Sequence, residues 1–487
     1  MIKYMAQPGM TSFAGGLPHP SYFAFESLAV KALPPNANLT TGAPVPADSD
    51  LVSLDVAKYG QQGQDLATAL QYGSANGYAP LVSFIREWVK SVYEPATSDW
   101  QVLLHNGNTD GVSKMVRLLC NPGDYILVEA MTFPSSQGVW IPMGCKGAGI
   151  KMDQYGIRAD DMRHVLETWD QTHPGDKRPH VLYVVPVGSN PTGTTMSAAR
   201  RQEIMAVCEE FDVIICEDDP YCALQFQHYV PNKDQTVHVQ SAEEFRSTMV
   251  PSFLKFDRQG RVIRLESFSK TLAPGNRCGA FVANPMFIER LIRATEVETQ
   301  SPSGWSALII SSLLHQWGIS GYLTWLARLK SEYENRRNVM LDAICASFDV
   351  KQAEASGIKG AEGLVAYVKG TDVAAFSFVP PTGGMFVWIK VYLSSAPTWS
   401  SYVDAGHEDP ERQFVDDLME KLIADNVLLV PGYHYYPFIG ADKLTTKAQG
   451  LESGVGYFRL AYSMPVKEEM QGGIERMANV FAKTWTQ

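Results

Sequence analysis

The sequence has little cysteine, and the cysteines it has are scattered. Its 487 residues include seven, an odd number with no CxxC pair. They are Cys120, Cys145, Cys208, Cys216, Cys222, Cys278 and Cys345. This pattern excludes a disulfide framework and a zinc knuckle. We therefore expect free thiols in a reducing compartment of the cytoplasmic type.

Long apolar runs and an excess of positive charge are also missing. The apolar stretch Trp305–Leu314 is about half a membrane span, and the start, MIKYMAQPGM, has no apolar core for a signal peptide. The 41 Lys and Arg residues stand against 52 Asp and Glu, a net charge of −11. This balance disfavours a general nucleic-acid surface and binding to anionic membranes. We expect a soluble, cytoplasmic protein.

The middle of the chain alternates short β-rich runs with amphipathic stretches. Val112, Met115, Val116 and Leu119, for example, have the i, i+3, i+4, i+7 spacing of a helix. The runs that predict strands are Val102–His105, Tyr125–Glu129, Val181–Val185, Val213–Cys216, Val262–Leu265 and Gly279–Ala283. Continuous apolar strands separated by helices predict an α/β fold with a mostly parallel sheet covered on both faces.

Three other segments differ from this part of the chain in composition and in pattern. Residues 35–65 are rich in Pro, Gly, Asn and Asp and predict a long loop, and residues 227–250 predict a polar surface insertion. A helical pattern from Tyr322 to Phe348 leads into three strand candidates, FSFVPPTGGMFVWIKV, VLLVPGYHYY and YFRLAY, which indicate a smaller α+β domain. The expected parts are an N-terminal segment that contributes to the small domain and active site, a large domain, and a connector helix with the small domain; they are residues 1–47, 48–320 and 321–487.

Reactive side chains follow five of the expected strands, where open parallel sheets bind ligands. Taken singly, each group also fits an ordinary turn, helix cap or core side chain. Three carboxylates in EDDPY could cap a helix or bind a metal, but no histidine is near them, so we expect no metal. Together, an aromatic ring, an amide, a carboxylate, a tyrosine, a lysine and an arginine form a complementary set for pyridoxal 5′-phosphate (PLP). The groups are Gly107–Thr109, Met131–Phe133, Gly188–Gly193, Glu217–Tyr221 and Glu266–Arg277.

The motifs SNPTG, EDDPY, SFSK and PGNR, in this order, resemble those of class I/II aminotransferases. The resemblance runs from AGGLPHPSYF (14–23) to FRLAY (458–462). It implies the aspartate-aminotransferase-like fold type I, with a mostly parallel seven-stranded sheet in a large PLP domain and a smaller α+β domain. The segments 69–81, 260–270 and 383–391 are most similar to the fungal aromatic-amino-acid aminotransferases and the kynurenine/2-aminoadipate aminotransferases. Those relatives have an N-terminal arm with a substrate-site Arg upstream of where this chain begins, so gating and side-chain preference stay open.

The resemblance implies a role for each residue that meets the cofactor ring. Lys270 would hold PLP covalently and then act as general acid/base, and Asp218 would pair with the pyridine nitrogen. Asn190 and Tyr221 would hydrogen-bond the phenolic oxygen, with Tyr221 counted among the catalytic residues. Phe133 would stack on the ring.

The resemblance also implies a phosphate site and a substrate site. The phosphate would be held at a helix N-terminus by Asn108, Thr109, Ser267, Ser269 and Arg277. Tyr72 would reach the phosphate held by the partner subunit, which implies a homodimer. Arg459 would bind the substrate α-carboxylate as a bidentate fork, with Asn190 beside it and Gly16 lying over the substrate.

These roles imply a transaminase that moves an amino group between an aromatic L-amino acid, or 2-aminoadipate or kynurenine, and a 2-oxo acid. The aromatic residues that could line a pocket, or simply belong to the core, are Tyr433, Tyr435, Tyr436, Phe438, Tyr22, Phe23 and Phe25. A PLP-dependent lyase, acting by C–S cleavage, β-elimination or decarboxylation, is the alternative on the same fold. A transcription factor with an aminotransferase-like domain would need a basic winged-helix domain, whereas here the AGGLP motif begins at Ala14.

Overall fold

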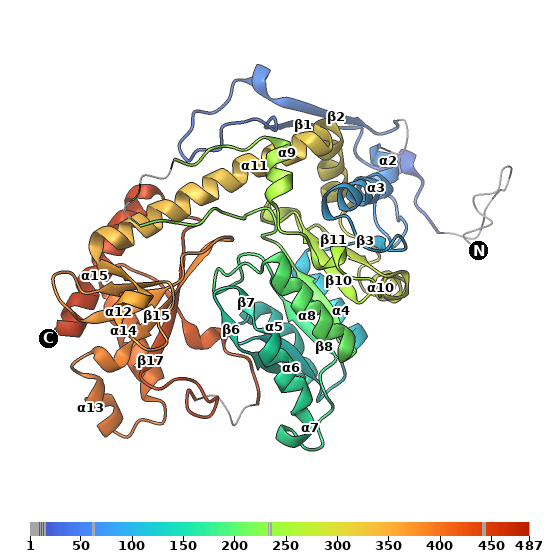
Figure 1. The fold of residues 1–487 in the computed structure, drawn as a ribbon. Helices are drawn as coiled ribbons and strands as arrows, with labels where there is room; N and C mark the ends of the chain where they lie inside the picture. The colour runs from blue at the N-terminus through green and yellow to red at the C-terminus, as the bar shows by residue number, and fades with distance from the viewer. Residues whose placement is uncertain are drawn as a thin grey trace.

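The computed structural model describes residues 9, 11, 13, 16–60, 64–231, 233, 236–440 and 445–486. Ala14 and Gly15 of the AGGLP motif therefore lie outside the described residues. Figure 1 shows two bodies side by side, each built on a sheet, with the long helix α11 running across both. Within the described part of the chain, no helix combines the length and apolar character needed to cross a membrane.

The larger sheet has seven strands in the order β3-β11-β10-β9-β8-β4-β5. Only β11 runs against its neighbours β3 and β10; the other described pairs are parallel. The bounds are β3 Gln101–His105, β4 Tyr125–Glu129, β5 Lys146–Ile150, β8 Val181–Val184, β9 Ile214–Asp218, β10 Val262–Ser267 and β11 Gly279–Ala283. All six expected strands are present, so the predicted α/β fold with a mostly parallel sheet is confirmed.

Helices cover both faces of this sheet, because its strands are apolar on both sides. In β3, Val102 and Leu104 pack into one hydrophobic cluster while Leu103 packs into the other. The main covering helices are α3 Ala79–Trp88, α4 Asn108–Leu119, α5 Pro134–Trp140, α6 Ala159–Glu167, α8 Ala198–Glu210 and α10 Pro285–Glu298. Shorter elements are α2 Leu66–Ala69, α7 Trp169–Thr172, β6 Met152–Asp153 and β7 Gly156–Ile157.

Helix α11, Gly304–Ser347, joins the two bodies. Gly318 has φ 65° and ψ 178°, so two helical stretches meet there. The second stretch contains the predicted connector and packs against α15 Lys467–Thr486. The connector helix predicted from Tyr322 to Phe348 therefore matches the structure closely.

The smaller sheet has six strands in the order β12-β13-β14-β15-β17-β16, and its neighbours are antiparallel. The three predicted strand regions supply β14, β15, β16 and β17. The bounds are β12 Asp349–Gln352, β13 Leu364–Tyr367, β14 Ala374–Phe378, β15 Phe386–Tyr392, β16 Val430–Pro431 and β17 Val455–Ala461, with α12 Ala353–Ser356, α13 Trp399–Asp404 and α14 Pro410–Ala424.

The prediction of one long loop over residues 35–65 is wrong in part. Strand β2, Val52–Ala57, lies within it and pairs antiparallel with β1, Ser27–Ala32. The Pro- and Gly-rich flanks hide a short alternating strand whose Leu54 and Val56 are buried. The expected boundary after residue 47 thus falls between two paired strands. The insertion at 227–250 likewise contains a helix, α9 Ala242–Thr248, which starts with a Ser241–Glu244 capping box and packs on α11.

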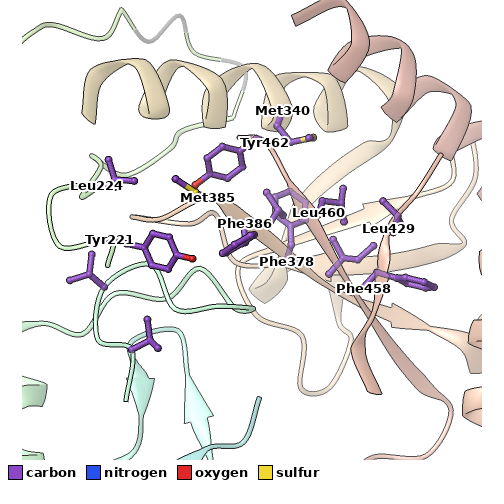
Figure 2. Close-up of a cluster of buried hydrophobic side chains, with 14 of the residues drawn as sticks. Tyr221, Leu224, Met340, Phe378, Met385, Phe386, Leu429, Phe458, Leu460 and Tyr462 are labelled. Atoms are coloured by element: carbon purple, nitrogen blue, oxygen red, sulfur yellow. The ribbon is translucent and has the colours of Figure 1, made fainter. Parts of the chain in front are cut away.

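Two glycine turns meet where the bodies join. Gly188 precedes the SNPTG turn and Gly384 precedes β15, and both have positive φ. A Cβ on Gly188 would overlap the backbone of Gly384, so neither turn has room for a side chain. The Gly384 N–H donates to the Leu224 carbonyl at 2.9 Å. Figure 2 shows Tyr221 and Leu224 from the large body lying near Met385 and Phe386 from the small one.

Candidate active site

Lys270 follows the carboxyl end of β10, in a turn that leaves its side chain partly buried. The pKa of its ammonium group is lowered, chiefly by burial and then by the charges of Arg277 and Arg459. Two fixed cations near a half-buried lysine favour its neutral form. A neutral amine can form a covalent bond to a carbonyl carbon or accept a proton.

Asp218 ends the neighbouring strand β9, buried with two donors on its carboxylate. The Tyr183 hydroxyl donates to Oδ2 at 2.7 Å, and Asn108 Nδ2 donates to Oδ1 at 2.6 Å. Burial raises the pKa of Asp218, while these two hydrogen bonds and the charge of Arg264 oppose the rise. A cationic ring N–H facing this carboxylate would favour its ionised form.

The carboxylates beside Asp218 form ion pairs with buried arginines. Glu217 Oε1 lies 3.1 Å from Arg201 Nη1 and 3.0 Å from Arg264 Nη1. Asp219 Oδ2 lies 3.0 Å from the same Arg264 nitrogen. Side chains alternate along a strand, so Asp218 points the opposite way from its two neighbours. No group of three or more candidate metal ligands is found among the residues the structure describes.

A cationic cradle forms where α4 begins. Gly107 precedes the helix with φ 90°, and a Cβ there would overlap the Arg277 guanidinium. Arg277 donates to the Asn106 carbonyl at 3.1 Å and to Ser269 Oγ at 3.4 Å, and Ser267 Oγ donates to Ser269 Oγ at 3.0 Å. Unpaired N–H groups of a first helical turn attract phosphate.

The two α4 residues predicted at the phosphate lie in that first turn. Thr109 is exposed there. The side chain of Asn108 is on Asp218 instead, which leaves its backbone N–H for the predicted contact.

Arg459 reaches this cluster from β17 of the small body, opposite Trp388 on β15. Its Nη1 donates to Asn190 Oδ1 at 2.7 Å. Its Cζ lies 4.3 Å from the centre of the Phe386 ring and 5.3 Å from that of Tyr435. The buried Nε has no hydrogen-bond partner within the described part of the chain. A guanidinium held by an amide and two rings, with a spare donor, suits a carboxylate.

Tyr221 and Phe133 flank the strand ends, whereas Tyr72 and Gly16 are exposed. Tyr221 is buried edge-on against Phe386 with ring centres 6.0 Å apart, and burial raises the pKa of its phenol. Phe133 is partly buried just ahead of α5. Tyr72 is 63% exposed. Gly16 is exposed, with no described atom within 4 Å of a Cβ built on it.

The candidate aromatic pocket residues separate into different places. Tyr435 lies beside Arg459, as described. Tyr433 donates its hydroxyl to Asp416 at 2.6 Å, and Phe25 packs edge-on against Trp305 with ring centres 4.8 Å apart. Tyr22 is exposed. Of these four residues, Tyr435 is the one that lies beside Arg459, so we keep it as a pocket residue.

Two site residues escaped the sequence analysis. Tyr183 is a mid-strand apolar residue in the sequence, and its contact with Asp218 needs the pairing of β8 with β9. Glu129 ends β4 and is fully buried. Burial raises its pKa to about 8, helped by the charge of Asp218 and opposed by Ser189 and the Val185 N–H. Its Oε1 has no partner among the described residues. The signal was its position at the carboxyl end of a predicted strand.

The fold and this cluster define a PLP-dependent enzyme of fold type I. The pattern of the aminotransferase class I and II family matches residues 35–436, and the chain belongs to this family. An aromatic amino acid aminotransferase of Schizosaccharomyces pombe is 33% identical over 469 residues, covering 96% of this chain and 90% of that protein. The mitochondrial kynurenine/alpha-aminoadipate aminotransferase of Mus musculus is 29% identical, covering 99% and 94%. Aminotransferase Aro8 from Candida albicans superposes with a TM-score of 0.86 at 31% identity, covering 100% and 95%.

The described residues fit PLP. A buried carboxylate with two orienting donors suits a ring nitrogen, a cationic cradle at the start of α4 suits a phosphate, and a lysine of lowered pKa lies beyond the next strand. The protein is therefore a PLP-dependent transaminase, and the relatives' names do not favour the lyase alternative.

Proposed function

We propose that the enzyme transaminates aromatic L-amino acids, with 2-aminoadipate or kynurenine as secondary donors and a 2-oxo acid as acceptor. The observation that carries this proposal is the Arg459–Asn190 hydrogen bond, which joins the proposed carboxylate receptor of the small body to the strand-end cluster of the large one. The names of the relatives in Schizosaccharomyces pombe and Mus musculus support the substrate class.

In this proposal Arg459 orients the substrate. Its fork takes the α-carboxylate, while the rings of Phe386 and Tyr435 beside it exclude water and offer apolar contact. We place no second arginine to receive a side-chain carboxylate. An unpaired carboxylate in such a pocket costs several kcal/mol, so aspartate would be a poor donor.

Lys270 would move the reacting proton. When bound, PLP supplies an electron sink that stabilises negative charge at the substrate Cα. Lys270 Nζ would take the Cα proton and deliver it to C4′ of the cofactor, the transfer that distinguishes transamination from elimination. Asp218 would keep the ring nitrogen protonated, and Asn190 and Tyr221 would bind the phenolic oxygen. Phe133 would stack on the ring. The backbone N–H of Asn108, with Thr109, Ser267, Ser269 and Arg277, would hold the phosphate.

We also propose a homodimer. The proposed parts of each chain are residues 1–47, 48–320 and 321–487. Tyr72 would contact the phosphate held by the partner subunit, which accounts for its exposure in one chain, and Gly16 would cover the substrate. Other large apolar side chains exposed near the N-terminal part support such an interface; they are Leu17, Tyr22, Phe25 and Tyr59. The free thiols of all seven cysteines fit a cytoplasmic location.

The test is a panel of amino donors and 2-oxo acids, read by cofactor absorbance. Phenylalanine, tyrosine and tryptophan should convert the cofactor to its amine form, and a 2-oxo acid should restore it. A kcat/KM for aspartate equal to that for phenylalanine would overturn the substrate class. Release of pyruvate, ammonia or carbon dioxide without the amine form would indicate the lyase. Arg459→Lys, which keeps the charge but loses the fork, should raise KM.

A further inference from the structure

A short segment of the small body, Tyr435–Phe438, is hydrogen-bonded to the large body. The Thr132 N–H donates to the Tyr435 carbonyl at 2.8 Å, and the Gly147 N–H donates to the Phe438 carbonyl at 2.7 Å. Between these two bonds, the side chain of Gln137 contacts the segment twice. Its Nε2 donates to the Tyr436 carbonyl at 3.0 Å, and its Oε1 accepts from the Phe438 N–H at 2.8 Å.

Gln137 thus pairs with the segment much as a neighbouring strand would. It is buried on α5, and its own N–H donates to the Phe133 carbonyl one turn earlier. Thr132 directly precedes Phe133. The segment is therefore hydrogen-bonded to residues on both sides of Phe133, the residue proposed to stack on the cofactor. A buried glutamine whose donor and acceptor both meet backbone groups is held in one orientation.

The strand β5 is shaped to receive the same segment. Gly147 and Gly149 face Pro437, and a Cβ on either would come within 3.0 Å of the proline ring. Gly147 and Gly149 have no positive φ, so their backbone conformation does not require glycine. Close approach of Pro437 is what the missing side chains permit.

The other side of the segment meets the substrate-binding arginine. The Tyr435 ring centre lies 5.3 Å from Arg459 Cζ and 5.6 Å from the Trp388 ring, which it meets edge-on. Arg459 and Trp388 are paired across β17 and β15. A contact that holds Tyr435 therefore supports one face of the Arg459 guanidinium.

We propose that Gln137 is a positioning residue for substrate carboxylate binding: it clamps residues 435–438 to the large body and so holds Tyr435 against Arg459. The proposal rests on the proposed function, because it assigns Arg459 to the α-carboxylate. Gln137 is not placed in contact with substrate or cofactor, so its effect is on binding and not on proton transfer by Lys270.

The first experiment is Gln137→Ala in the cofactor-loaded enzyme. Loss of two hydrogen bonds should raise KM for both phenylalanine and the 2-oxo acid by about tenfold. The kcat and the amount of bound cofactor should stay within about twofold, because Lys270 and Asp218 are untouched. A merely structural role would lower kcat and bound cofactor and leave KM unchanged. Unchanged KM in a well-folded variant overturns the proposal.

Gln225→Ala is the matched control. Its side chain also makes two backbone hydrogen bonds, to the Cys222 carbonyl at 2.8 Å and from the Val250 N–H at 2.9 Å, but both lie within the large body. It should lose comparable stability without a rise in KM. An equal rise in both variants would show that any lost glutamine acts this way, and would refute the clamp.

Two further variants separate the clamp from folding. Gln137→Glu keeps the shape, but when ionised it turns an oxygen toward the Tyr436 carbonyl. When protonated it regains a donor, so its KM relative to wild type should fall as pH is lowered. Gly147→Ala pushes on Pro437 from β5 with Gln137 intact and should raise KM in the same way. A pH-independent ratio together with normal KM in Gly147→Ala contradicts the proposal. A wild type without transaminase activity would instead overturn the proposed function.

Discussion

Glu129→Gln should change how the stability of the apoprotein depends on pH. Glu129 is fully buried, and its pKa rises from 4.5 to about 8, first through burial and then through the Asp218 charge. Below pH 4.5 the carboxyl is protonated in both the folded and the unfolded chain, so it has no pH-dependent effect. Between pH 4.5 and 8 the unfolded chain releases the proton and the folded chain keeps it, so stability falls as pH rises. Above pH 8 the cost is constant.

The magnitude follows from the size of the shift. A difference of 3.5 pKa units, from 4.5 to 8, corresponds to about 5 kcal/mol once the plateau is reached. Between pH 5.5 and pH 8.5, integration of the linkage relation gives a change of about 3 kcal/mol. Glutamine has nearly the same shape and does not titrate. The free energy of unfolding of Glu129→Gln minus that of wild type should therefore increase by about 3 kcal/mol over this range.

Urea unfolding of the two apoproteins at several pH values measures this difference. The infrared band of a protonated carboxylic acid, present in wild type at pH 7 and absent from the variant, checks the protonation state directly. A stability difference that is the same at pH 5.5 and pH 8.5 would show that Glu129 is ionised in the folded protein. The reasoning from burial would then be wrong.

Three further predictions concern the proposed cofactor site. Borohydride reduction and peptide mapping should place the cofactor on the peptide that contains Lys270, and label on another lysine would refute the assignment; Lys270→Ala should still bind PLP but lose the absorbance of the lysine-bound form. Asp218→Asn should keep the site's shape and slow the half-reaction by several orders of magnitude, and near-normal turnover would mean that another group faces the ring nitrogen. Mixing Tyr72→Phe subunits with inactive Lys270→Ala subunits should restore activity at one of two sites, whereas a fully active monomer at low concentration would exclude this arrangement.

The position of the site could be predicted from the sequence because strand ends are visible there. The β-rich runs that predict β9 and β10 place Asp218 and Lys270 at one edge of the sheet. Which of three adjacent carboxylates faces the site depends on Arg201 and Arg264, which come from other elements. The family resemblance implies Asp218, and these tertiary contacts give the physical reason why its two neighbours are held elsewhere.

Other features were missed for physical reasons that differ from one another. Strand β5, KGAGI, contains two glycines and so has weak strand propensity, yet the glycines are there to receive Pro437. Strand β2 is short and flanked by loop-forming residues. Gln137 contacts residues about 300 positions away in the chain, so nothing local marks it. For β5 and Gln137 the deciding partner is distant in sequence.

The close approach of Gly188 and Gly384 constrains how this enzyme can vary. The backbone of each glycine fills the volume that a side chain on the other would need, so no order of substitution avoids the overlap. Both also have positive φ, which few other residues adopt. Exchange at either position would have to move the Asn190 turn or the start of β15, which carry the two sides of the proposed substrate site. New specificities on this scaffold should therefore arise at residues that line the site, such as Tyr435, while the junction between the bodies stays fixed.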